Sequence, residues 1–252
     1  MICALMIGRA GSTGFPGKNI HPVLGRPLAA YPLMAARSSR YVESLYVSTD
    51  SPEIAEIGKS FGADLIDRPP ELAGNETLAD DVFVHCYLEI ARRIALRKSS
   101  VEFMVLLFAN AATVSGDLID QGIEALRSDP SIDSAVSVSI YNMWSPIRAR
   151  KIGDDACLHP FVPFESLGDS SKFNCDRNSQ GNVYYADMGV SIVRPRCLEE
   201  IEKGLLPQRW MGQKIHPVLS WGGCDVDYEW QIPMVDFWLR KLGIKEASPE
   251  NL

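Results

Sequence analysis

The chain of 252 residues lacks any long apolar run, and no charged segment precedes an apolar one at its start. The first absence argues against a membrane-spanning helix and the second against a secretory leader. Positive charge is also scarce, because 25 Lys and Arg residues stand against 32 Asp and Glu residues, for a formal net charge of −7. Nucleic-acid backbones bind best to clustered cations, so we do not expect a nucleic acid as partner. The lack of a long apolar run likewise leads us to expect no membrane as partner.

The six cysteines are scattered, and none forms a C-x-x-C pair or lies near a histidine at metal-ligand spacing. Reduced thiols in the cytoplasm are the simplest interpretation of this pattern. The length suits one large α/β domain or a domain with an insertion, and we interpret residues 1–252 as a single domain.

What the sequence does have is a glycine-rich loop directly after its first apolar run, residues 2–7. The loop contains four glycines, two cations, a hydroxyl and an amide: Gly8, Gly11, Gly14, Gly17, Arg9, Lys18, Ser12 and Asn19. Glycines allow backbone N–H groups to turn toward an anion, and the two cations add charge. The loop therefore predicts a phosphate site, with a flexible basic turn as the alternative.

Two well-known phosphate motifs do not fit this loop. Ala10 stands at the second glycine of a dinucleotide-binding G-x-G-x-x-G pattern. The P-loop pattern G-x-x-x-x-G-K-[ST] fails at two positions. Ser12 stands where the first glycine is required, and Asn19 stands where Ser or Thr is required.

The rest of the chain alternates between apolar runs and helical patterns. Strands are predicted at 45–50, 64–67, 101–108, 134–141, 183–186, 189–193 and 215–221, and helices at 28–40, 51–62, 77–96, 117–127 and 228–242. This alternation predicts a doubly wound, mostly parallel α/β sheet. Ligands bind at the carboxyl ends of such strands, where the glycine loop, Asp50, Arg68 and Asn110 are expected to face one crevice.

Residues 142–182 interrupt the alternation with a stretch rich in Pro, Asp, Ser and Asn that also contains aromatic side chains. We interpret this stretch as a small insertion, either a substrate lid or an arm that packs on a second subunit.

Asp225 and Asp227 lie two residues apart before the final helix. On an extended segment they would point the same way and could bind one Mg²⁺, which needs only one or two carboxylates. In the alternative, Asp227 caps the helix and Asp225 is solvated.

Several of these segments resemble the acylneuraminate cytidylyltransferases, which include the CMP-sialic acid, CMP-legionaminic acid and CMP-pseudaminic acid synthetases. Residues 9–19 match the family motif R-x-x-S-K-G-x-P-x-K-N at all but one position. Residues 47–56 resemble V-S-T-D…E-I-A-E, residues 68–73 resemble R-P-x-E-L-A, and Asp225-x-Asp227 resembles the metal-binding D-x-D.

The resemblance implies a nucleotide-diphospho-sugar transferase-like Rossmann-type fold. It also implies attack by the hydroxyl of an acidic 2-keto sugar on the α-phosphate of CTP, with release of pyrophosphate. Catalytic roles fall to Arg9, Lys18 and the two aspartates, which would hold Mg²⁺. Nucleotide contacts are implied for Arg9, Gly11, Ser12, Gly14, Lys18, Asn19, Arg68, Thr77 and Asn110. A homodimer formed through the insertion is also expected.

Correspondences in the second half of the chain are fewer. Pro146-x-Arg148 resembles P-x-K, Asp176-Arg177-Asn178 resembles N-R-Q, and Tyr185 with Gly189 resembles Y-x-x-N-G. These matches imply sugar contacts for Arg148, Arg177, Tyr185, Asp187 and Gly189. For both arginines, simple surface exposure is the alternative.

Three departures keep other functions open. Thr13 replaces a lysine, residues 106–113 replace L-L-Q-P-T-S-P-L-R with Asn110 as a substitute for the glutamine, and Asp187-Met188-Gly189 lacks an asparagine. The alternatives are a nucleotidyltransferase of this fold with another nucleotide or sugar, and a binding protein that has lost catalysis. No general base stands out among the four histidines.

Overall fold

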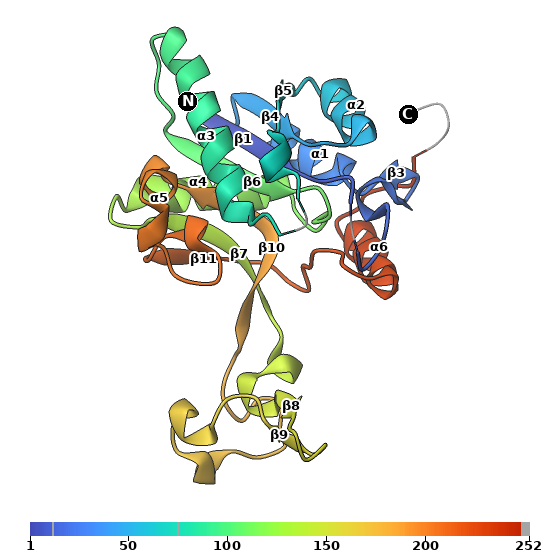
Figure 1. The fold of residues 1–252 in the computed structure, drawn as a ribbon, viewed down its shortest axis with the longest axis vertical. Coiled ribbons are helices and arrows are strands. Elements are labelled where there is room, and N and C mark those ends of the chain that lie inside the picture. Colours follow the sequence, from blue (N-terminus) through green and yellow to red (C-terminus); the bar gives the residue numbers. More distant parts are fainter. Residues whose placement is uncertain (12, 75, 248–252) are drawn as a thin grey trace.

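The computed structural model describes residues 1–11, 13–74 and 76–247. Its centre is a seven-stranded sheet with the strand order β11-β7-β10-β6-β1-β4-β5 (Figure 1). The strands are β1 (Ile2–Ile7), β4 (Ser44–Ser48), β5 (Asp64–Ile66), β6 (Phe103–Phe108), β7 (Ser134–Ile140), β10 (Tyr184–Val193) and β11 (Ile215–Leu219). All neighbouring pairs are parallel except those of β10 with β6 and β7. The prediction of a mostly parallel sheet is therefore confirmed.

Helices cover both faces of the sheet. They are α1 (Ala30–Ser38), α2 (Pro52–Ser60), α3 (Ala79–Leu96), α4 (Gly116–Ser128), α5 (Pro195–Glu199) and α6 (Ile232–Lys241). In β1, Ala4 and Met6 pack into a core with α1, α2, α4 and α6, whereas Cys3 and Leu5 pack into a second core with α3 and α5. This alternation of buried side chains follows from the two-residue period of a strand and explains why β1 is apolar throughout.

Short elements complete the body of the protein. A hairpin joins β2 (Pro22–Val23) and β3 (Arg26–Pro27), and 3-10 turns occupy Lys18–Ile20, Pro70–Leu72, Ile201–Lys203, Arg209–Met211 and Glu229–Gln231. The final helix was expected over 228–242 with an interruption near Pro233. In the structure the 3-10 turn comes first, and Pro233 lies in the first turn of α6, where its missing N–H costs nothing.

Strand β10 was expected as two strands, 183–186 and 189–193, but it is one strand with a bulge. Its register against β7 shifts between Ala186 and Ser191, and Met188 inside the shift has a φ of 60°. A bulge inserts an extra residue without ending the strand, so the polar interruption at 187–188 gave a false boundary.

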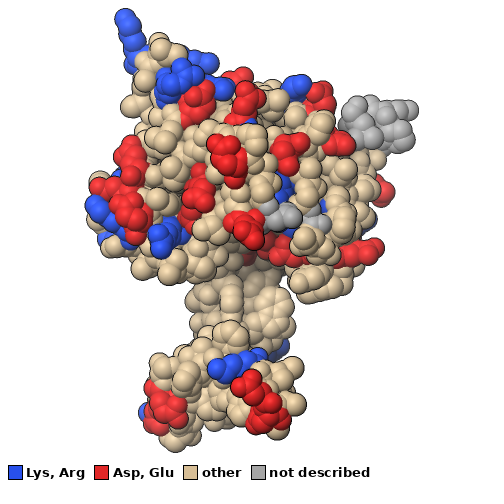
Figure 2. Space-filling model, viewed as in Figure 1, with Lys and Arg blue, Asp and Glu red and all other residues tan. Residues whose placement is uncertain are grey.

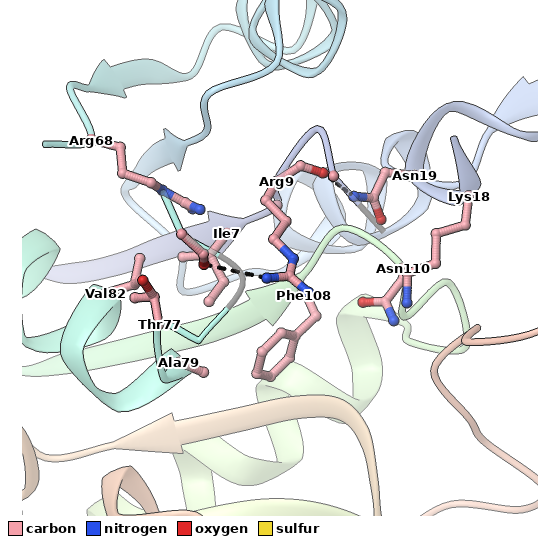
Figure 3. Close-up of a pocket in the computed structure, with 13 residues that line it drawn as sticks. Ile7, Arg9, Lys18, Asn19, Arg68, Thr77, Ala79, Val82, Phe108 and Asn110 are labelled. Carbon is pink, nitrogen blue, oxygen red and sulfur yellow. Dashed lines mark hydrogen bonds between the residues drawn. The ribbon is translucent and has the colours of Figure 1, made fainter. Parts of the chain in front are cut away.

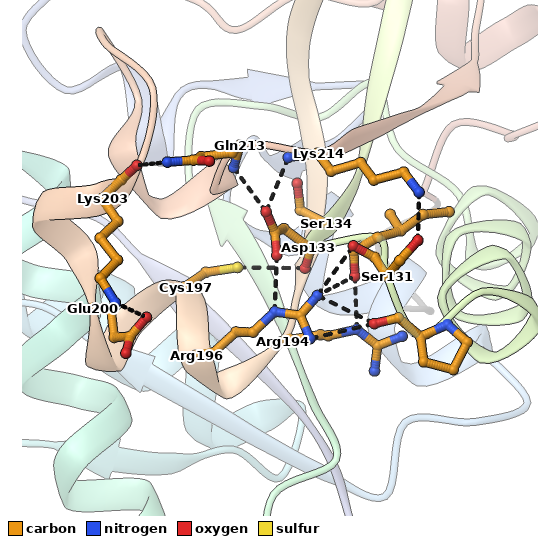
Figure 4. A network of polar contacts seen from close by, with 12 residues as sticks. Ser131, Asp133, Ser134, Arg194, Arg196, Cys197, Glu200, Lys203, Gln213 and Lys214 are labelled. Atoms are coloured by element: carbon orange, nitrogen blue, oxygen red, sulfur yellow. Dashed lines mark hydrogen bonds and ion pairs between the residues drawn. The ribbon is translucent and has the colours of Figure 1, made fainter.

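At the amino end of β7, a polar network fastens β10, β11 and α5 together (Figure 4). The Asp133 carboxylate accepts a hydrogen bond from Arg196 Nε at 2.8 Å and from the backbone N–H groups of Gln213 and Lys214, both at 2.9 Å. Arg194 donates to the Ile132 carbonyl at 2.7 Å and to the Leu126 carbonyl at 2.6 Å. These contacts fix the end of the sheet opposite to the glycine loop.

Between β7 and β10 the chain forms an arm that projects away from the body on a narrow stalk (Figures 1 and 2). The arm contains the hairpin of β8 (Arg150–Ile152) and β9 (Leu158–Pro160), with 3-10 turns at Asn142–Trp144, Pro146–Arg148, Phe164–Leu167 and Ser170–Lys172. It exposes large apolar side chains, among them Trp144, Ile152, Leu158 and Phe161. Within the described part of the chain, no helix has the length and apolar character needed to cross a membrane.

Candidate active site

A cleft opens at the carboxyl ends of β1 and β6, bounded by α3 and the glycine loop (Figure 3). Its polar lining contains Arg9, Lys18, Asn19, Arg68, Thr77 and Asn110, and the glycines Gly8, Gly11 and Gly74 also border it. The fold thus brings together residues that are far apart in the sequence, such as Gly8 and Asn110. Of the other predicted nucleotide contacts, Gly14 lies against the acidic segment and Ser12 lies outside the described residues.

Three cations converge on this cleft. The Arg68 guanidinium donates to the Ser48 carbonyl at 2.6 Å and to the Ser48 hydroxyl at 3.3 Å, and burial lowers its pKa. Arg9 Nη1 donates to the Gly74 carbonyl at 3.4 Å, and Lys18 enters from the far side of the glycine loop. Such a concentration of positive charge in a cleft of an acidic protein suits a polyanionic ligand.

The glycine loop is held in place by side chains at its two ends. Asn19 Nδ2 donates to the Arg9 carbonyl at 2.9 Å, and Asp50 Oδ1 accepts from the Ala10 N–H at 2.9 Å. At Gly8 a Cβ atom would come within 2.6 Å of the Ala109 Cβ atom, so only glycine lets the loops after β1 and β6 approach this closely. Asp50, expected in the crevice, therefore acts as an anchor of the loop.

The acidic segment lies beside the end of β6. Asn110 Nδ2 donates to the Val226 carbonyl at 3.0 Å and to Asp225 Oδ2 at 3.4 Å, and the Val226 N–H donates to the Asn110 carbonyl at 3.0 Å. Lys18 Nζ forms an ion pair with Asp227 Oδ1 at 2.6 Å. Burial, and then the charge of Asp227, raise the pKa of the Asp225 carboxyl.

In the alternative stated above, Asp227 caps the final helix, and the hydrogen bonds of the 3-10 turn at Glu229–Gln231 bear on it. Gln231 Oε1 accepts from the N–H groups of Asp227 at 2.7 Å and of Tyr228 at 2.8 Å. The side chain of Gln231 therefore caps the turn, and the Asp227 carboxylate remains directed at the glycine loop. Thr77 does not cap helix α3, whose N-cap is Leu78; the Thr77 Oγ1 donates instead to the Glu71 carbonyl at 3.3 Å.

Asp225 and Asp227 have the donor chemistry of a partial metal site. Among the described residues, no group of three or more His, Cys, Asp or Glu side chains could hold a metal ion. As a pair, Asp225 and Asp227 offer hard oxygen donors two residues apart, and the Asp225 carboxylate receives one long hydrogen bond from the side chain of Asn110. A pair of this kind fits a hard divalent cation that completes its coordination with water and substrate oxygens.

Asp187, expected near a sugar, lies in the interior. Its carboxylate accepts from the hydroxyls of Ser137 and Ser139, the latter at 2.7 Å, and from the Gly189 N–H at 3.1 Å. These contacts fix the bulge of β10. At Gly189 a Cβ atom would lie 2.9 Å from the Thr113 carbonyl oxygen, so the absence of a side chain here allows β10 to lie close to the backbone at Thr113.

The other predicted sugar contacts lie on the arm, which projects away from the sheet (Figure 1), or on strand β10 where it joins the arm. Arg148 Nη2 donates to the Cys175 carbonyl at 2.5 Å, and Arg177 is exposed. The Tyr185 hydroxyl donates to the Trp144 carbonyl. Whether these residues contact a sugar stays a prediction.

Sequence reasoning missed the apolar side of the cleft. Ile7, Ala79, Val82 and Phe108 line it, and Phe108 packs on the rings of Phe83 and Trp210. The available signal was the position of Phe108 as the last residue of an apolar strand whose carboxyl end was expected to face the crevice.

The sheet topology and the cation-lined cleft define an α/β nucleotidyltransferase fold. The structure is similar to a CMP:2-keto-3-deoxy-manno-octonic acid synthetase complexed with CTP, with a TM-score of 0.64 and 14% identity over 96% of this chain and 99% of that one. It is also similar to 4-diphosphocytidyl-2C-methyl-D-erythritol synthase from Anaerococcus prevotii, with a TM-score of 0.56 and 14% identity over 95% and 96% of the two chains.

Sequence comparison narrows the class. Residues 3–104 match the family model described as cytidylyltransferase. N-acylneuraminate cytidylyltransferase of Oncorhynchus mykiss is 39% identical over 80 residues, which are 32% of this chain and 18% of that protein. CMP-N,N'-diacetyllegionaminic acid synthase of Legionella pneumophila is 29% identical over 212 residues, 81% of this chain and 86% of that protein.

The first part of the chain, residues 3–104, is thus similar to the cytidylyltransferase family, and the resemblance stated from its motifs is confirmed. The matched segment spans only about a fifth of the length of the N-acylneuraminate cytidylyltransferases of O. mykiss and Escherichia coli, at 18% and 20%.

Proposed function

We propose that the protein is a cytidylyltransferase that transfers CMP from CTP to an acidic 2-keto sugar of the sialic acid type and releases pyrophosphate. The observation that supports this most directly is the contact of Lys18 with Asp227 at 2.6 Å, because it joins the acidic pair to the glycine loop that lines the cleft. Phosphoryl transfer depends on positioning and charge neutralisation, which is what such a cleft supplies.

In this proposal Arg9, Lys18 and Arg68 bind the triphosphate, and Asn19 holds the loop in the geometry that presents it. The sugar hydroxyl oxygen forms a bond to the α-phosphorus as the bond to pyrophosphate breaks, and the hydroxyl proton passes to water. Asp225 and Asp227 would hold Mg²⁺, which supplies further neutralisation of phosphate charge when bound. Asn110 orients the acidic segment through its hydrogen bond to the Val226 carbonyl at 3.0 Å.

The sugar carboxylate is proposed to meet arginines of the arm, and the arm is proposed to pack on a second copy of the chain as a homodimer. Support comes from the exposed apolar side chains of the arm and from Arg148 and Arg177 beside them. A stable partner would cover this apolar surface, which water solvates poorly. The cytoplasm, with reduced thiols, is the proposed location.

Pyrophosphate release from each of the four nucleoside triphosphates, with a panel of acidic keto sugars and Mg²⁺, tests the proposal. Turnover is expected with CTP and a keto acid. Turnover with another nucleotide or with a sugar phosphate would replace the substrates within the same class. Binding of CTP without any product would instead indicate a binding protein, the alternative that the exchange of a lysine for Thr13 keeps open.

A further inference from the structure

The side chain of Gln231 makes three hydrogen bonds to the backbone of the acidic segment, residues 225–228. Its Oε1 atom accepts from the N–H groups of Asp227 at 2.7 Å and of Tyr228 at 2.8 Å. Its Nε2 atom donates to the Asp225 carbonyl at 3.1 Å. Only one orientation of the amide makes all three bonds, because its oxygen can only accept and its NH₂ group can only donate.

The bond to the Asp225 carbonyl goes beyond the capping of a helix. Capping satisfies free N–H groups at the start of a helix, and the two bonds to Oε1 do this. The Asp225 carbonyl precedes the 3-10 turn at Glu229–Gln231, so the third bond satisfies no group of that turn. It joins the backbone before Val226 to the backbone after it.

Asn110 holds the residue between the two aspartates. Its side chain donates to the Val226 carbonyl and its backbone carbonyl accepts from the Val226 N–H, both at 3.0 Å. The Val226 side chain is fully buried. Asn110 and Gln231 together therefore fix the peptide groups on both sides of Val226, and the directions of the flanking side chains depend on these peptide groups.

The base of the Gln231 side chain is itself held firmly, because this residue directly precedes α6. The inner face of α6 is buried, with Val235 and Leu239 fully inaccessible and Trp238 2% exposed. Trp238 Nε1 also donates to the Trp221 carbonyl at 2.8 Å. A side chain that begins at an anchored helix holds its partners more precisely than one on a free loop.

We propose that Gln231 is a positioning residue of the cation site, whose amide fixes the backbone so that Asp225 and Asp227 present their carboxylates to one divalent cation. This inference rests on the proposed function, in which the pair holds Mg²⁺. With only two carboxylates from the protein, the affinity for the ion depends strongly on the direction of each. A neutral amide provides this support without adding charge beside the ion.

Binding of Mn²⁺ to the protein without nucleotide tests the proposal, because Mn²⁺ takes the same oxygen ligands as Mg²⁺. Electron paramagnetic resonance measures the free ion during the titration, and the binding that Asp227→Asn loses identifies the site. Gln231→Met has a similar length but no amide. It should weaken this binding by about tenfold, the lower end of the range for losing a group that orients metal ligands.

Two further variants separate positioning from helix stability. Gln231→Asn keeps an amide that suits a helix cap, but it is one methylene shorter and cannot span the three bonds, so it should also weaken Mn²⁺ binding. Val235→Ala removes buried packing from α6 and leaves the Gln231 amide in place. It should lower the melting temperature and leave the affinity for Mn²⁺ nearly unchanged.

Unchanged Mn²⁺ affinity in a folded Gln231→Met protein would overturn the proposal, and Gln231→Asn decides the matter if the methionine variant does not fold. An equal loss of affinity in Val235→Ala would assign the effect to a loosened α6 and overturn it too. So would the absence of any Mn²⁺ binding that depends on Asp227. The expected order of affinities without pyrophosphate release from any nucleotide would leave this inference standing and reject the proposed function alone.

Discussion

Lys18 and Asp227 form an ion pair at 2.6 Å although 209 positions separate them in the chain. The lysine side chain is 12% exposed and the aspartate side chain 57% exposed. The pair joins the glycine loop to the acidic segment, and at Gly14 a Cβ atom would lie 2.7 Å from the Asp227 carbonyl oxygen. The glycine loop and the acidic segment are therefore packed closely together, with no room for a larger side chain at Gly14.

Lys18→Met should lower the rate of pyrophosphate release by about a hundredfold or more, because it removes one preorganised cation from the triphosphate site. Half-exposed ion pairs contribute little to stability, about 0–1 kcal/mol, so the fold should persist. Initial rates and thermal melting measure the two effects. Lys59→Met, which removes the cation of the exposed Lys59–Glu56 pair, is the control and should leave the rate unchanged. Equal rates for both variants would contradict the role of Lys18.

Asp227→Asn should cut activity by orders of magnitude and raise the Mg²⁺ concentration needed for half-maximal rate, because an amide is a weaker ligand of a hard cation. Titration of Mg²⁺ at fixed CTP and sugar measures both. Asp236→Asn breaks an ion pair with Arg240 on α6 and serves as the matched control. Near-wild-type rates in Asp227→Asn would reject the proposed metal role.

Asp187→Ala should lower the free energy of unfolding by about 3 kcal/mol or more. It leaves the buried Ser139 hydroxyl and the Gly189 N–H without their acceptor, and leaves the Ser137 hydroxyl with only the Val190 carbonyl at 3.3 Å. Urea denaturation measures the change, with Asp176→Ala on the exposed arm as a control that should alter stability little. If Asp187 instead contacts the sugar, the variant will keep its stability and show a raised KM for the acceptor.

Asp80→Asn should raise the melting temperature near pH 7. Burial raises the pKa of the Asp80 carboxyl above its ordinary value of 3.8. This carboxyl therefore binds a proton more tightly in the folded chain than in the unfolded chain. Stability therefore falls as pH rises from 3.8 through the raised pKa and stays low above it. The variant's advantage should shrink as pH falls toward 3.8, and melting curves across pH 3.5 to 7.5 will show it. An advantage independent of pH would exclude this cause.

Phe161→Glu should convert a dimer into monomers without unfolding the body, because the side chain is 61% exposed on the arm. Sedimentation velocity at micromolar concentration measures the mass of each form. Lys172→Glu, also on the arm but polar in the wild type, is the control for added negative charge. A wild-type monomer under these conditions would reject the proposed homodimer.

The glycine loop, the parallel strands and the cluster of cations could all be predicted from the sequence. Each depends on neighbouring residues: β1 is apolar at every position because both of its faces are covered, and Arg68 and Asn110 follow strand ends that meet at one edge. The resemblance of residues 9–19 to a family motif is likewise local, and the family match over residues 3–104 covers the same part of the chain.

Long-range packing determined the remaining features. Phe108 lines the cleft because Phe83 and Trp210 support its ring from distant segments. Asp187 turns inward because the hydroxyls of two serines of β7, Ser137 and Ser139, donate hydrogen bonds to its carboxylate there. The direction of the arm follows from the pairing of β7 with β10 through the stalk. Local pattern specifies which segments become strands and loops, but the partners of a side chain depend on which distant segments the packed core brings beside it.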